Sequence, residues 1–190
     1  MHWYWFDRFT EFESGRAATA IKNVSLAEDH LHDYFPGYPV MPNSLILEGM
    51  AQVAGTLVGE VNEFEERVVL AKVSNVRFHA LAQPGDTLTY KATIDSLGPD
   101  GAFIVGTSHL GDQLQAECEF CLAFLDDRNE TRELFKPDDF LRMLRVFRLF
   151  EVGRNADGSP LRIPERLLRA EHASNSQAVV DRAVNRDDKF

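Results

Sequence analysis

The sequence predicts an α+β fold in which one long apolar helix lies across an antiparallel sheet. The first observation is a segment from Leu45 to Val61 that is apolar on nearly every side, as buried helices are. The second is the region from Arg67 to Leu125, where apolar and polar residues alternate between short turns, as in half-buried strands. A strand at Ala17–Val24 precedes the helix, so the predicted order is strand, helix and antiparallel meander.

The chain of 190 residues is long enough for one domain with an extension. We expect the α+β domain at residues 1–125 and a partly helical extension with a polar tail at residues 126–190. The formal net charge of −10 disfavours nucleic acid as a partner, since nucleic-acid binding requires a basic face. No signal peptide and no apolar stretch of about 18 residues is found, so we expect a cytoplasmic protein without a transmembrane segment.

The two cysteines, Cys118 and Cys121, are spaced as in a CxxC motif. They fall within an alternating strand pattern, in which residues three apart point to opposite faces. No second pair of ligands accompanies them, so we expect neither a disulfide nor a metal site.

The chain enters the predicted helix through a rigid loop. Residues up to Gly15 are aromatic and mixed in charge, and a polar loop at 23–33 follows the first strand. The segment Tyr34–Asn43 then contains three prolines, which fix φ and restrict the residues before them. Asn43 and Ser44 stand where an N-cap is expected, so that their side chains accept hydrogen bonds from the free amides of the first turn.

The predicted helix spans roughly residues 43–62 and contains one acid that does not fit its apolar character. Glu48 lies one turn into a helix that we expect to be buried on all sides, and a buried carboxylate needs a partner or a proton. A structural carboxylate held by Gln52 or Ser44, each four residues away, is one interpretation. We favour the other, an acid placed in a pocket for proton transfer. The helix also has three glycines that are expected to admit close packing: Gly49, Gly55 and Gly59.

Four strands are expected after the helix, separated by turns that contain glycine. Their expected ranges are 67–78, 87–97, 102–110 and 113–125. In the extension, Pro137–Asp139 is a helix start, and the apolar stripe that follows ends near Gly153. We expect the stripe to pack on the core, with a carrier-protein dock or a membrane-surface helix as alternatives, and we expect a mobile polar tail from Ser174.

Several separated motifs carry a family resemblance over residues 6–125: Phe6–Arg8, Lys22–Glu28, Phe35–Gly37, Pro39–Pro42, Leu45–Gln52, Val76–Phe78 and Gln83–Asp86. Together and in this order they resemble the β-hydroxyacyl-(acyl carrier protein) dehydratases of fatty acid synthesis, which have the hot-dog fold. A set of separated motifs in the right order is much more specific than one short pattern. The resemblance implies a long central helix wrapped by the antiparallel sheet.

The resemblance also implies the conversion of a (3R)-hydroxyacyl thioester to the trans-2-enoyl thioester without a cofactor. A histidine directly before the Phe-Pro-Gly turn removes the C2 proton, and a helix carboxylate, here Glu48, protonates the leaving hydroxyl. Backbone amides at the helix start, here Asn43 and Ser44, bind the thioester oxygen. The pocket forms between two subunits, so a homodimer or an oligomer of dimers is expected, with the acyl chain carried by acyl carrier protein or coenzyme A. Further substrate-binding residues are expected at Phe35, Gly37 and Gln52.

Two positions depart from the family where the chemistry occurs. Tyr34 stands in place of the histidine, and Asn43 in place of the usual glycine. Tyrosine is a poor base near neutral pH because its ordinary pKa is about 10, although Tyr34 can donate a hydrogen bond to the substrate. His32 is the candidate replacement base, and it reaches the pocket only if the loop folds back. The alternative is that His30 and His32 are solvated loop residues.

Three functions stay open from the sequence. The first is a dehydratase with Glu48 as the acid and His32 or Tyr34 at the altered base position. The second is an acyl thioesterase, in which a helix carboxylate activates water. The third is a non-catalytic acyl-thioester-binding protein or the silent subunit of a heterodimer, which Tyr34 favours. We prefer the first, because an inactive site has little reason to keep an acid in an apolar helix.

Overall fold

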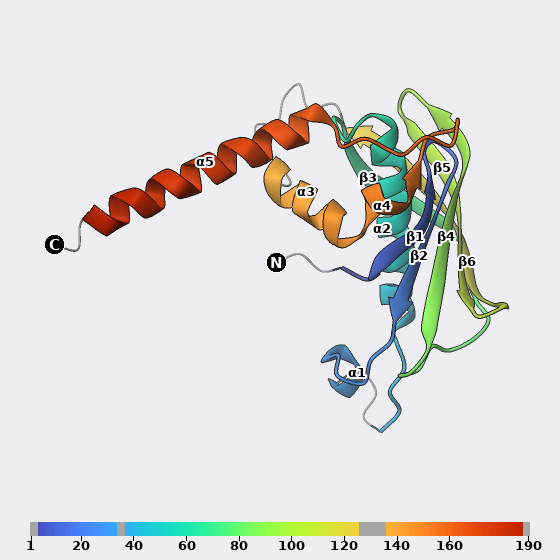
Figure 1. Ribbon diagram of the computed structural model, residues 1–190. Helices are drawn as coiled ribbons and strands as arrows, with labels where there is room; N and C mark the ends of the chain where they lie inside the picture. Colours follow the sequence, from blue (N-terminus) through green and yellow to red (C-terminus); the bar gives the residue numbers. More distant parts are fainter. Residues whose placement is uncertain (1–3, 34–36, 126–135, 188–190) are drawn as a thin grey trace.

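The computed structural model describes residues 4–33, 37–125 and 136–187. A seven-stranded sheet lies along one long helix, and the C-terminal helices lie beside its β1 end (Figure 1). The strands are β1 (Arg8–Glu13), β2 (Ala17–Asn23), β3 (Arg67–Phe78), β4 (Thr87–Gly98), β5 (Gly101–Leu110), β6 (Gln113–Leu125) and β7 (Gly153–Arg154). The helices are α1 (His30–Asp33), α2 (Asn43–Val61), α3 (Pro137–Val146), α4 (Leu149–Val152) and α5 (Glu165–Asp187).

The sheet confirms the predicted α+β class and the antiparallel meander. Its strand order is β3-β6-β5-β4-β2-β1-β7. Every neighbouring pair is antiparallel except β1 and β7. The central helix α2 contacts β2, β3, β4, β5 and β6, so it crosses most of the sheet, as the hot-dog fold requires. Among the described residues, no helix is both long and apolar enough to cross a lipid bilayer.

Besides the two-residue strand β7, three elements are not predicted by the sequence pattern. β1 lies in the region of mixed charge before Gly15, and α1 is a single turn inside the predicted polar loop. The third is α5, which carries charged residues around much of its surface and therefore has no apolar stripe to predict it. The segment from Ser174, which we predict to be a mobile tail, is part of α5, which continues to Asp187.

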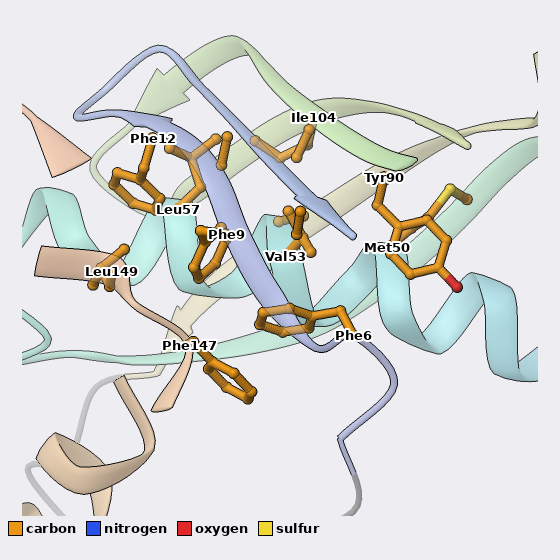
Figure 2. Packing of buried hydrophobic residues seen from close by; sticks show 14 of the residues in the cluster. Phe6, Phe9, Phe12, Met50, Val53, Leu57, Tyr90, Ile104, Phe147 and Leu149 are labelled. Carbon is orange, nitrogen blue, oxygen red and sulfur yellow. The ribbon is translucent and has the colours of Figure 1, made fainter. Parts of the chain in front are cut away.

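The core lies between α2 and the inner face of the sheet. Met50, Val53 and Leu57 of α2 meet Tyr90 of β4 and Ile104 of β5 there (Figure 2). Alternation places these side chains inward, since successive strand residues face opposite sides of a sheet. The same alternation separates the two free cysteines: Cys118 is buried, and Cys121 is only partly buried.

The prediction that α2 is buried on all sides is wrong for the single chain. Its sheet-facing side is fully buried, for example at Ile46 and Val53. On other sides Leu45 and Leu47 are only partly buried, and Glu48 is exposed. The physical reason is that the sheet of one chain covers only one side of the helix, which leaves an apolar strip around Glu48 for another surface to cover.

The extension packs on the core, as its apolar stripe predicts. The buried apolar residues of this segment are Leu141, Leu144, Phe147, Leu149, Leu161 and Leu167. The ring of Phe147 lies 4.2 Å from that of Phe6 and 5.1 Å from that of Tyr4, between ring centroids, and Figure 2 shows it beside β1. Arg148 has a φ of 58°, which ends α3 and turns the chain into α4. The extension therefore closes the β1 end of the molecule, and β7 adds a last strand to the sheet.

Candidate functional site

The start of α2 presents backbone N–H groups without a side-chain cap. The helix begins at Asn43 with Pro42 as its N-cap, so the predicted capping by Asn43 and Ser44 side chains is wrong. The reason is that Pro42 is extended (ψ 134°) and its own carbonyl accepts the first bonds, from Leu45 N at 2.9 Å and Ile46 N at 3.2 Å. The amides of Asn43 and Ser44 precede those bonds, and a helix N-terminus of this kind favours a negatively charged oxygen.

Glu48 is held by Gln52, as one sequence interpretation expects, but it is exposed rather than buried. Gln52 Nε2 donates a hydrogen bond to Glu48 Oε1 at 3.0 Å. Gln52 Oε1 accepts one from the backbone N–H of Trp5 at 2.9 Å. The Trp5 N–H can only donate, so it fixes which end of the amide faces Glu48. Gln52 therefore orients the carboxyl group and leaves Oε2 as the oxygen available for a proton.

Gly49 brings two other segments against the helix beside Glu48. A Cβ at this position would lie 2.5 Å from the carbonyl oxygen of Trp5 and 2.6 Å from Cε2 of Tyr90. The close packing predicted at this glycine is confirmed, as it is at Gly59, which Phe64 approaches. At Gly55, no atom of the described residues lies within 4 Å of the Cβ position.

Gly49→Ala is expected to destabilise the protein by about 1–3 kcal/mol, since the added methyl group would overlap a backbone atom that cannot swing away. The matched control is Gly55→Ala, which has open space and is expected to be neutral or slightly stabilising through its better helix propensity. Thermal unfolding of both variants measures the difference. Equal Tm values for the two variants would contradict the close packing of Trp5 and Tyr90 on α2.

A buried ion pair supports the loop before the site. Lys22 is 5% exposed, and its Nζ lies 2.5 Å from Glu28 Oε1 and 4.0 Å from Asp7 Oδ1. Glu28 Oε2 accepts a hydrogen bond from Ser25 N at 3.0 Å. Burial raises the pKa of Glu28, but the bonds from Lys22 and Ser25 outweigh this and hold the pKa below its ordinary value. The Glu28 carboxyl group therefore stays ionised, and its bonds to Lys22 and Ser25 anchor the segment that leads into α1.

The two histidines of α1 have different surroundings. The ring of His30 meets the ring of Trp5 edge to face, with centroids 5.1 Å apart. Its Nε2 is buried and has no hydrogen-bond partner among the described residues. Burial lowers the pKa of His30, helped by Lys22, while Glu28 and Asp29 oppose the shift. His32, the base predicted from sequence, has an exposed side chain.

The remaining predicted residues are divided between described and undescribed parts of the chain. Tyr34 and Phe35 lie outside the described residues. Gly37 is exposed with a φ of 79°, in the left-handed region that favours glycine. Asn43 and Ser44 are both exposed at the helix start. The structure thus brings Glu48 and Gln52 together and places the N-terminus of α2 directly before them.

Sequence reasoning missed Trp5 and Tyr90 as parts of this site. Trp5 stands in an aromatic N-terminal segment that shows no periodic signal. Tyr90 occupies an inward position of an alternating strand, which predicts burial but not its approach to Gly49. The Oη of Tyr90 is buried and has no hydrogen-bond partner in the part of the chain that the structure describes. Burial raises the pKa of Tyr90, assisted by Asp7 and Glu28.

Residues 3–112 match the family model of the FabA-like domain, and this region contains Trp5, α1 and all of α2. The chain belongs to the FabA-like family. Curated relatives agree with this assignment over a similar region. The chain is 35% identical over 122 residues to the 3-hydroxyacyl-[acyl-carrier-protein] dehydratase FabZ of Caldanaerobacter subterraneus subsp. tengcongensis, which covers 64% of this chain and 86% of that protein. It is 37% identical over 118 residues to FabZ of Pelotomaculum thermopropionicum, which covers 62% of this chain and 84% of that protein.

Solved structures confirm the hot-dog fold of this FabA-like chain. The dehydratase heterocomplex ApeI:P from Xenorhabdus doucetiae matches with a TM-score of 0.54 and 15% identity, over 64% of this chain and 82% of that one. The protein PH1136 from Pyrococcus horikoshii matches with a TM-score of 0.53 and 18% identity, over 65% of this chain and 85% of that one. At these identities the likeness concerns the fold alone.

Proposed function

We propose that this FabA-like chain is a (3R)-hydroxyacyl-thioester dehydratase of fatty acid or related acyl-chain synthesis, with acyl carrier protein as the carrier. The observation that carries the proposal is the oriented Glu48–Gln52 pair one turn after the uncapped start of α2, in a chain of this family. Relatives at 35–37% identity are named as dehydratases of this class. We therefore propose that Glu48 is the acid of the same dehydration reaction in this chain.

In the proposed reaction a base removes the C2 proton, and the electrons of that C–H bond form the C2–C3 double bond. The C3–O bond breaks, and the oxygen leaves as water with the proton of Glu48 Oε2. Gln52 keeps Oε1 occupied as an acceptor, so the acid is presented with one defined oxygen. The amides of Asn43 and Ser44 bind the thioester oxygen, where negative charge develops as the C2 proton leaves. Exchange with water then returns both groups to their starting protonation states.

The base position distinguishes this chain from the family pattern. Tyr34 occupies the place of the family's histidine, and we assign it a hydrogen bond to the substrate rather than proton abstraction, because of its high ordinary pKa. The imidazoles nearest to it in the sequence belong to α1, at His30 and His32. A silent heterodimer subunit is the alternative that Tyr34 favours. In that case a partner chain supplies the histidine.

A homodimer is part of the proposal, because the exposed Glu48 and the partly exposed Leu45 and Leu47 need a covering surface. The edge strand β3 supports it: among the described residues it pairs with β6 alone, and it exposes Leu70 and Val76. A long apolar edge strand readily pairs with another chain.

Leu70→Glu is therefore expected to convert a dimer into a monomer and to abolish turnover with it. Leu97→Glu is the matched control, since Leu70 and Leu97 are each 44% exposed but Leu97 lies at the end of β4. Sedimentation at micromolar concentration measures both variants. A wild-type chain that sediments as a monomer would contradict the dimer.

The charge of the protein surface determines where an acyl carrier protein could bind. An acidic carrier protein requires a basic patch, and three arginines of the extension are instead paired with its own acids: Arg142 with Asp138 and Asp139, Arg145 with Glu171, and Arg148 with Glu151. Lys72 of β3 is exposed in the single chain, but it lies on the strand that the proposed dimer covers. The proposal includes a cytoplasmic location for the reaction.

The experiment that tests the proposed function is ultraviolet absorbance with both substrates. An active chain consumes a trans-2-enoyl thioester by hydration and forms one from a (3R)-hydroxyacyl thioester. Thiol titration runs in parallel, because free thiol identifies a thioesterase instead. If the absorbance does not change and the thioester stays intact, the chain is neither a dehydratase nor a thioesterase for these substrates, and the silent-subunit alternative is favoured.

A further inference from the structure

We propose that a carrier protein docks on an apolar surface at the start of α2, and that this docking does not depend on attraction between opposite charges. The proposal rests on the proposed dehydratase function and names the kind of carrier that this chain accepts. The surface, which we call the loop patch, consists of three exposed side chains from three loops: Leu26, Tyr38 and Leu81. A carrier that fits it has an apolar contact face with few acidic side chains.

Backbone hydrogen bonds hold the three loops together at one end of the sheet. Val24 N, in the loop after β2, donates to Asp86 O at 2.9 Å, and Gly85 N donates back to Val24 O at the same distance. Both partners of Val24 belong to the loop before β4. That loop also accepts a bond of 2.8 Å at Ala82 O from Met41 N, in the loop before α2. Figure 1 shows this end of the molecule, with α1 and the start of α2, away from α5.

The loop patch lies beside the N-terminus of α2. Met41 precedes Asn43, the first residue of the helix, by two positions. The bond from Met41 to Ala82 therefore places the loop that carries Leu81 next to the helix start. The amides that we assign to the thioester oxygen lie at the same helix start. A carrier seated on the loop patch would thus bring its thioester to the end of the molecule where the reaction is proposed.

The side chains of the loop patch are each about half exposed. The exposed fraction is 53% for Leu26, 53% for Tyr38 and 50% for Leu81. A single exposed apolar residue is common on a protein surface and needs no explanation. Three large ones on adjoining loops form a patch, and exposed apolar patches mark interaction sites. Tyrosine is also enriched among the residues that contribute most to binding at protein interfaces.

The chain around the loop patch has no fixed positive charge on its surface. The sequence contains no Lys or Arg between Lys22 and Arg67, and none between Arg77 and Lys91. Lys22 itself contributes little to the surface, because it is 5% exposed and its Nζ is paired with Glu28. Attraction of an acidic carrier face has no basic partner in these segments.

Acidic side chains lie near the loop patch instead. Asp29 is exposed after the loop that carries Leu26, and Asp86 is partly exposed in the loop that carries Leu81. Like charges that face each other across an interface oppose binding, and they lower the association rate most strongly at low salt. The loop patch therefore favours a carrier face that is apolar and neutral or basic, and it disfavours an acidic one.

The first test presents one acyl group on three supports: an acyl carrier protein of net negative charge, a variant of that carrier with surface Asp and Glu replaced by Asn and Gln, and pantetheine alone. The wild-type chain is expected to show a higher kcat/KM with the neutralised carrier than with the acidic one. With the acidic carrier, kcat/KM is expected to rise as the Debye length shortens from about 30 Å at 0.01 M salt to about 8 Å at 0.15 M. The pantetheine thioester controls for effects of salt on the chemistry. A kcat/KM that falls with salt for the acidic carrier alone would reveal attraction to a basic surface and would overturn the proposal.

The second test substitutes the loop patch. Leu26→Gln and Leu81→Gln are each expected to raise KM for the neutralised carrier about 5–30-fold, the effect of losing a well-packed interface side chain, and to leave pantetheine turnover unchanged. Phe103→Gln is the matched control, since Phe103 is 57% exposed but lies opposite Ser96, near the far end of β4. Equal KM values for Leu81→Gln and Phe103→Gln would contradict docking on the loop patch. Sedimentation that changes in Leu81→Gln alone would contradict it too, by assigning the patch to a contact between copies of the chain.

Binding measured without turnover separates this proposal from the dehydratase function. NMR signals of the ¹⁵N-labelled neutralised carrier are expected to shift when the wild-type chain is added, and to shift much less with Leu81→Gln. If this result is obtained with a chain that does not turn over the pantetheine thioester, the docking stands and the dehydratase function fails. If the signals do not shift while the pantetheine thioester is turned over, the docking fails and the dehydratase function stands.

Discussion

Glu48→Gln is expected to lower the kcat of dehydration about 10²–10⁴-fold and to leave the Tm of the chain unchanged. The loss has that size because general acid catalysis contributes a factor of this order. Stability is preserved because Glu48 is exposed in the single chain and because a glutamine oxygen can still accept the hydrogen bond from Gln52. Rates in the ultraviolet assay and thermal unfolding give the two quantities.

The control for this substitution is Glu65→Gln, which removes one exposed carboxylate just after the end of α2 and should keep full activity. Wild-type rates in Glu48→Gln would remove this carboxyl group from the mechanism. A large fall in Tm would instead assign it the structural role that the sequence left open.

Phe147→Ala is expected to destabilise the chain by about 3–5 kcal/mol, the usual cost of removing a buried phenylalanine side chain. Phe147 is 3% exposed and its ring contacts Tyr4, Phe6 and Phe9. Its backbone carbonyl also accepts a hydrogen bond from Phe9 N at 2.9 Å, which the substitution leaves in place. The effect therefore measures side-chain packing between the extension and β1, and urea unfolding detects it.

Val146→Ala is the matched control in the adjacent position, because Val146 is 69% exposed and its truncation is expected to change stability by less than about 0.5 kcal/mol. A cost below about 1 kcal/mol for Phe147→Ala would mean that the extension is not part of the core. The expected difference in stability between the two variants would mean that residues beyond the family region are part of the folded core.

The fold is largely predictable from the chain, and the failures have physical causes. The bounds of β6 agree with prediction because its inward and outward positions alternate, and those of β3 agree although its burial pattern is irregular. β1 is not predicted because its buried Phe9 and Phe12 are three residues apart, across a register shift between Phe9 and Glu11, and so do not alternate. α5 is not predicted because its sequence has no hydrophobic repeat at the helical period.

The sequence predicts which residues of α2 form the candidate site, but not how exposed they are or which other segments lie beside them. Glu48 and Gln52 are four positions apart on a helix, so their contact follows from spacing alone. The exposure of Glu48 depends on which side of α2 the sheet covers, and one sequence gives no such information. The placement of His30 depends on Trp5, which comes from a distant part of the chain, so only the folded structure brings the two rings together.

The most direct test of the dehydratase function is the hydration of a trans-2-enoyl thioester by the wild-type chain in heavy water, followed by mass spectrometry and NMR. The predicted product has one deuterium at C2, a hydroxyl at C3 with R configuration, and an intact thioester. Enoyl thioester recovered unchanged, or hydrolysed at the carbonyl without deuterium at C2, would contradict proton transfer at this site.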